Sequence, residues 1–119
     1  EYASLITIKI DDGEGTKELS GTVFHQDELR IVDINGYEVD LNPKGNMLVT
    51  DHQDQPGIVG KVGTLLGDND VNIASMQLGR NEAGGEAIMV INIDQQLDEG
   101  LKNKLLEIEG MNDFSLLSL

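Results

Sequence analysis

Apolar and polar residues alternate over short stretches in the first third of the chain. Isoleucine occupies every second position of the range 5–10, and Tyr, Val and Leu alternate with acids in the range 37–41. A repeat of two places the apolar side chains on one face of a β-strand and the polar ones on the other. Apolar residues also gather in the ranges 19–24 and 29–34. The pattern therefore predicts four short strands.

Turn-forming residues separate these strands. Asn35-Gly36, between the third and the fourth, is the strongest short signal for a hairpin. The segment has no helical repeat, so its sheet has one apolar face and nothing within the segment to cover that face. We therefore expect residues 1–46 to be an incomplete domain, an antiparallel β-meander whose cover lies upstream or in a partner chain.

A different repeat begins at residue 47. Apolar residues at helical spacing predict one helix from Pro56 to about Gly67 and a second from Asp98 to Gly110. Four strands are expected around these helices, at residues 47–52, 71–80, 86–94 and 114–119. The order β-α-β-β-α-β is the split arrangement of a ferredoxin-like fold. The whole chain is thus predicted to be α+β, a partial antiparallel meander followed by a ferredoxin-like βαββαβ domain.

Composition narrows the classes of partner. Twenty-two acids against eight bases give the 119-residue chain a formal charge of −14, which repels nucleic-acid backbones and anionic membrane surfaces. The absence of Cys excludes disulfides and thiolate chemistry. No apolar run approaches the ~20 residues of a membrane span. We expect a cytoplasmic location and, because the chain begins at Glu1, a piece of a longer polypeptide.

Glycines are dense in the first predicted helix. The run from Gly57 to Gly63 is GxxGxxG, which is neither a dinucleotide-binding motif nor a phosphate loop. On a helix, Gly60, Gly63 and Gly67 share one stripe, and each costs ~1 kcal/mol relative to alanine. Two explanations stay open: close approach of another backbone or a ligand, or tight packing on the protein's own sheet.

Three polar residues flank that helix. Asp54 precedes it, where a carboxylate either caps the free N–H groups or binds a ligand ammonium while those groups bind a ligand carboxylate. His52 ends the preceding strand, and Asn72, with both a donor and an acceptor, begins the next one. A free amino acid requires such a pairing of opposite charges.

No set of residues has catalytic spacing. The two histidines, His25 and His52, lie in separate halves of the chain, and no nucleophile or metal-binding motif is present. We therefore expect this chain by itself to have no catalytic residues, no metal and no cofactor.

Several runs resemble known regulatory sequences. Residues 52–66, followed by 71–76, resemble the ACT regulatory domain. Residues 79–90 are similar to a hairpin of the D-3-phosphoglycerate dehydrogenase family, and residues 30–37 are similar to the end of the intervening domain in the longer form of that enzyme.

The resemblance implies that residues 1–46 end an intervening, allosteric-type domain and that residues 47–119 form an ACT domain. The parent would be an oxidoreductase of serine biosynthesis that oxidises 3-phosphoglycerate with NAD, and its catalytic domains would lie upstream. Two ACT domains would pair side by side, in a homodimer or tetramer, and bind L-serine or a similar small amino acid between them.

The family's effector-contact positions fall on His52, Asp54 and Asn72 of this sequence, and Gly57 would let the effector approach the helix backbone. Arg30 would be a weak anion site in the intervening domain. Two other functions stay open. One is an oligomerisation module that binds no ligand, and the other is the regulatory segment of a bacterial iron–sulfur L-serine dehydratase.

Overall fold

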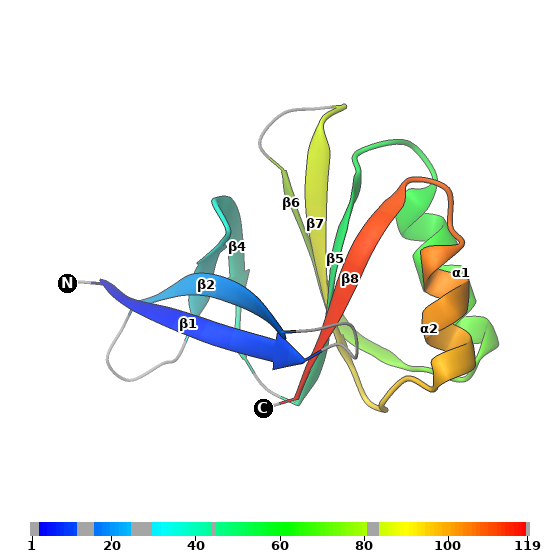
Figure 1. Cartoon of the computed structure of the whole chain (residues 1–119), viewed down its shortest axis with the longest axis horizontal. Coiled ribbons are helices and arrows are strands. Elements are labelled where there is room, and N and C mark those ends of the chain that lie inside the picture. Colours follow the sequence, from blue (N-terminus) through cyan, green and yellow to red (C-terminus); the bar gives the residue numbers. More distant parts are fainter. Residues whose placement is uncertain (1–2, 12–15, 25–29, 44, 81–83, 119) are drawn as a thin grey trace.

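The structure is a computed structural model, and it describes residues 3–11, 16–24, 30–43, 45–80 and 84–118. Figure 1 shows two antiparallel sheets, with both helices against the outer face of the second sheet. In chain order the elements are β1 (Ala3–Asp11), β2 (Thr16–Phe24), β3 (Ile31–Ile34), β4 (Tyr37–Leu41), β5 (Asn46–Gln53), α1 (Ile58–Asp68), β6 (Ile73–Arg80), β7 (Glu86–Ile93), α2 (Glu99–Leu106) and β8 (Met111–Ser118).

The second sheet has the strand order β6-β7-β5-β8, and its connections pass through α1 and α2. This order is the predicted ferredoxin-like βαββαβ arrangement, which the structure confirms. Several predicted boundaries were wrong. Strand β6 begins at Ile73 and not at residue 71, and helix α2 ends at Leu106 and not at Gly110. Helix α1 begins at Ile58, two residues after Pro56, because Gly57 takes a left-handed conformation with φ of 90°. Strand β8 begins at Met111, directly after Gly110 with φ of 95°, and Met111 pairs with His52 of β5.

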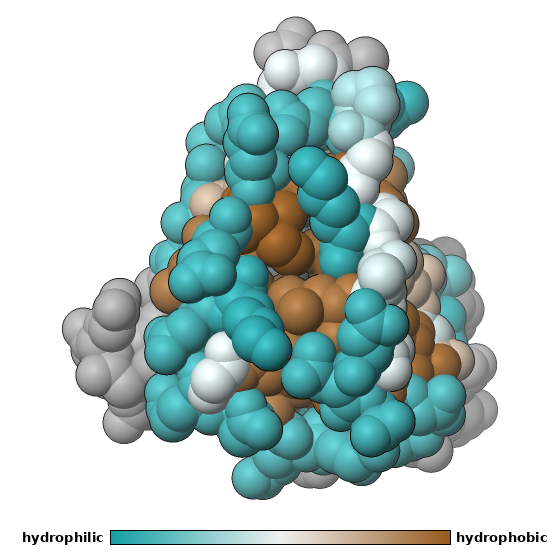
Figure 2. All heavy atoms as spheres, turned by 90° about the vertical axis from the view of Figure 1, so that its right-hand side faces the viewer, coloured by the Kyte–Doolittle hydropathy of each residue, from teal (hydrophilic) through white to brown (hydrophobic). Residues whose placement is uncertain are grey.

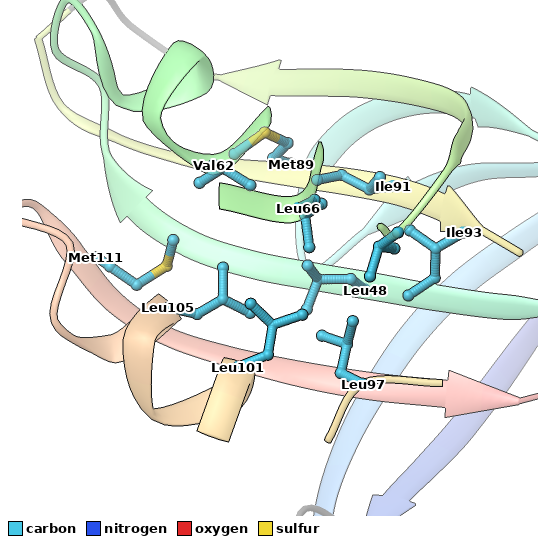
Figure 3. Packing of buried hydrophobic residues seen from close by; sticks show 11 residues of the cluster. Leu48, Val62, Leu66, Met89, Ile91, Ile93, Leu97, Leu101, Leu105 and Met111 are labelled. Carbon is cyan, nitrogen blue, oxygen red and sulfur yellow. The ribbon is translucent and has the colours of Figure 1, made fainter. Parts of the chain in front are cut away.

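The helices bury an aliphatic core against the sheet. Figure 3 shows side chains of β5, β7 and β8 meeting those of both helices. The fully buried members of this layer are Leu48, Val62, Leu66, Met89, Ile91 and Leu105. The carboxylate of Asp98 accepts the Leu101 N–H at 2.8 Å, so it caps α2 at the residue predicted to open that helix. Figure 2 shows that the outer surface of this layer is mostly hydrophilic, with hydrophobic atoms in a strip near its centre.

The meander packs on the opposite face of the same sheet. Its buried residues Ile31, Ile34, Val39 and Leu41 form one cluster with side chains of the second sheet. The expectation that nothing in this chain covers the meander was therefore wrong for β3 and β4. The physical reason lies in β7, where the five consecutive residues from Ala87 to Ile91 are all buried, so the second sheet has two apolar faces.

Two contacts fasten β4 to β6. The Asp40 N–H donates to Gln77 Oε1 at 2.7 Å, and Gln77 Nε2 donates to the Asp40 carbonyl oxygen. Near them, the backbone of β4 comes so close to Gly79 that a Cβ there would lie 3.0 Å from the Glu38 carbonyl oxygen. Strand β6 thus contacts the meander through the Gln77–Asp40 hydrogen bonds and through the close backbone approach at Gly79.

Candidate functional site

His52 lies on the helix side of β5 and has no exposed surface. Its Nδ1 is 3.0 Å from the Thr50 hydroxyl oxygen, and Nε2 is buried without a hydrogen-bond partner. Burial lowers the pKa of His52 below its ordinary value, and the nearby carboxylates of Asp54 and Asp51 oppose that shift only in part. The structure therefore places a neutral, buried imidazole near the end of β5.

This burial predicts a pH dependence of stability. Since the folded state lowers the pKa, the unfolded chain takes up the proton first as the pH falls below ~6.5. The free energy of unfolding should then decrease from pH 7 to pH 5, and His52→Gln should remove that part of the decrease. Urea unfolding of both proteins across this range measures the difference. Parallel curves for the two proteins would contradict the prediction.

Asp54 does not cap α1. Its Oδ2 accepts a hydrogen bond from Arg80 Nη1 at 2.9 Å and from the Gly84 N–H at 3.3 Å, while its own N–H donates to the Gly85 carbonyl oxygen at 2.8 Å. The hydrogen bond from Arg80, the largest cause, holds the pKa of the Asp54 carboxyl below its ordinary value. Asp54 is thus an ionised carboxylate that joins the loop before α1 to the end of β6 and to the β6–β7 hairpin.

The start of α1 has no side-chain cap. Gly57 is the N-cap residue, and the first turn contains no acid. The first helical hydrogen bond runs from the Lys61 N–H to the Gly57 carbonyl oxygen at 2.9 Å, so the N–H groups of residues 58–60 have no partner within the helix. These donors carry partial positive charge and suit an anionic group of a ligand.

Asn72 lies at the other end of α1. Its Nδ2 donates to Asp94 Oδ2 at 2.7 Å, and its N–H donates to Gln95 Oε1 at 3.1 Å. Because α1 has 11 residues, its two ends are ~16 Å apart. Within one chain, the structure brings His52 and Asp54 to the start of this helix and leaves Asn72 at its end.

Arg30, the predicted anion site, forms an ion pair with Asp40 at 2.6 Å. Both residues line a cleft of about 460 Å³ between the meander and the edge of the second sheet. The guanidinium is thus already engaged by a carboxylate of this chain.

Sequence reasoning missed Arg80, which is the cation bonded to Asp54. The sequence signal that could have found it was its position at the end of β6, because the following strand β7 pairs with the β5 strand that carries His52.

The three glycines of the α1 stripe lie under open space. A Cβ at Gly60, Gly63 or Gly67 would meet nothing within 4 Å. Packing on the protein's own sheet therefore does not explain these glycines, because the surface above them is open.

Over the described ranges, no three side chains of His, Cys, Asp or Glu gather where they could hold a metal ion. Among the same residues, neither helix has the length and apolar character needed to cross a membrane.

Residues 46–110 match the ACT domain family. They make up more than half of the chain, and the protein therefore belongs to that family. Together with the fold, this defines a regulatory ligand-binding module.

The chain also resembles three enzymes named D-3-phosphoglycerate dehydrogenase. It is 38% identical over 118 residues to that of Bacillus subtilis, which covers 99% of this chain and 22% of the relative. It is 37% identical over 113 residues to that of Synechocystis, which covers 95% of this chain and 20% of the relative. It is 34% identical over 119 residues to that of Methanocaldococcus jannaschii, which covers 100% of this chain and 22% of the relative. The predicted resemblance is confirmed, and it includes the meander. The chain spans about a fifth of the length of these curated relatives.

Proposed function

We propose that this chain is an amino-acid sensor, that its effector is L-serine, and that its parent is an NAD-dependent phosphoglycerate dehydrogenase of serine biosynthesis. The observation that carries the proposal is an ionised carboxylate, Asp54, beside a helix start without a side-chain cap. Asp54 would bind the ammonium group of the effector, and the N–H groups at the start of α1 would bind its carboxylate. The names of the relatives support the parent enzyme, and the choice of serine rests on the family resemblance of the sequence.

A second copy would complete the site. Strand β6 is an edge of its sheet, and Val59 and Leu78, on α1 and β6, are 37% and 45% exposed. If β6 pairs antiparallel with β6 of a second copy, the start of one strand lies beside the end of the other. The partner's Asn72 would then approach Asp54 and Arg80, which one chain alone cannot arrange. Two-fold symmetry would give two such sites per dimer.

A thermal melt with L-serine tests this function. At one hundred times the dissociation constant, binding should stabilise the folded state by about 2.7 kcal/mol and raise Tm. Asp54→Asn should abolish the rise, because it removes the charge that pairs with the ammonium group. Glu99→Gln removes a carboxylate from the first turn of the other helix and should leave the rise intact. A folded dimer whose Tm does not respond to millimolar L-serine would contradict the proposal.

The second candidate function is assembly without a ligand. The exposed apolar side chains of Val59 and Leu78 and the open space over the glycine stripe favour pairing of two copies by themselves. Sedimentation of the protein without amino acids, together with the melt, separates the two functions. A dimer that forms and shows no response to L-serine supports the assembly function. The three relatives named above are dehydrogenases, and no observation favours the dehydratase alternative.

A further inference from the structure

We propose that Arg80 determines the net charge of the ligand that the site at Asp54 accepts. By pairing with Asp54, Arg80 makes this part of the site neutral, so that it selects zwitterionic amino acids over ligands with a net positive charge. The proposal rests on the proposed function, because it assumes that Asp54 binds the ammonium group of the effector.

The geometry divides the two oxygens of Asp54. Oδ2 accepts two hydrogen bonds, from Arg80 Nη1 at 2.9 Å and from the Gly84 N–H at 3.3 Å. Oδ1 has no hydrogen-bond partner in the part of the chain that the structure describes. The Asp54 side chain is only 15% exposed, whereas that of Arg80 is 53% exposed. Arg80 therefore fixes the carboxylate through one oxygen and leaves the other for a ligand.

The other charged groups nearby do not replace Arg80. On β5, His52 is neutral because burial lowers its pKa, and Asp51 is a further carboxylate. On β7, Glu86 is exposed and its backbone pairs with that of Gln53. On α1, Lys61 is exposed one turn into the helix and has no ion pair among the described residues. Arg80 is thus the cation in direct contact with Asp54 in this part of the structure.

Loss of Arg80 would leave a lone carboxylate in the site of a strongly acidic chain. An amino-acid effector brings its own carboxylate within a few ångströms of that group, and the two negative charges repel each other. An amide of the same amino acid keeps the ammonium group and lacks the negative charge. It would therefore bind more tightly when the carboxylate of Asp54 has no cation beside it. Arg80 should therefore matter more for the ratio of the two affinities than for either affinity alone.

Titration calorimetry of the full chain with L-serine and with L-serinamide tests the proposal. The wild-type protein should bind L-serine more tightly. In Arg80→Met the ratio of the two dissociation constants should shift about tenfold toward L-serinamide. Arg80→Lys keeps the charge and should retain the wild-type preference. Arg80→Gln, which keeps a polar side chain without the charge, should shift the ratio as Arg80→Met does, and it serves as the charge-loss variant if Arg80→Met does not fold.

The outcomes separate two failures. If the wild-type protein binds neither compound, the proposed function is overturned, and the role of Arg80 falls with it. If the wild-type protein binds L-serine and the ratio is the same in all variants, only the role of Arg80 is overturned. In that case Arg80 would be a structural residue that holds the loop before α1, since loss of a structural contact weakens the binding of both ligands by the same factor.

Discussion

Leu105→Ala is expected to lower the free energy of unfolding by about 2–5 kcal/mol. Leu105 is completely buried in α2, and Figure 3 places it among the side chains that join this helix to the sheet. Truncation removes apolar contacts and leaves a cavity that the surrounding strands cannot fill. The loss is a large part of the ~5–15 kcal/mol that stabilises a typical domain.

The adjacent residue provides a matched control. Leu106 is 45% exposed on the same helix, so Leu106→Ala should change the free energy of unfolding by less than ~0.5 kcal/mol. Urea unfolding of the three proteins at one concentration measures both effects. Similar losses for the two variants would show that α2 does not pack on the sheet through the face described above.

Gly79→Ala is expected to cost about 1–3 kcal/mol and to loosen the meander. The added Cβ would lie 3.0 Å from the Glu38 carbonyl oxygen and 3.2 Å from the Tyr37 Cβ. One neighbour is a backbone atom and the other is a Cβ, and neither can move without the backbone. Strand β4 must therefore move away from β6. Hydrogen exchange should therefore rise in β4 and remain low in β5 and β7.

Gly100→Ala is the control for this substitution. Its Cβ would meet only Asp98 Oδ1, at an ordinary 3.5 Å, and alanine favours a helix by up to ~1 kcal/mol over glycine. The control should therefore be neutral or stabilising. If Gly79→Ala were equally harmless, the close approach of β4 to β6 would not exist in solution.

The periodicity of the sequence predicted the order of the elements because strands and helices differ in the spacing of their apolar residues. It also predicted that the second helix opens at Asp98, which the structure shows to be the cap of α2. The boundary at Ile58 escaped prediction, since the left-handed conformation of Gly57 takes the place of an ordinary cap. The docking of the meander escaped as well, although the continuous apolar run of β7 indicated a strand buried on both faces.

The candidate site was predictable as a set of residues and not as a geometry. Asp54 and His52 could be placed near the start of a helix from local spacing alone. The ion pair from Arg80 joins residues 26 positions apart, and it depends on how β6 and β7 return across the sheet. The distance between Asp54 and Asn72 likewise follows from the length of α1, and only the fold shows that a second chain would be needed to bring them together.

The two apolar faces of the second sheet have a practical consequence for truncated proteins. Residue 46 is a natural place to divide the chain by sequence pattern, yet removal of the preceding strands would uncover Met47, Val49, Ile88 and Val90 at once. An isolated ACT portion would then present a flat aliphatic surface to water and tend to aggregate. Expression of the regulatory portion should therefore retain β3 and β4, or replace these four side chains by polar ones.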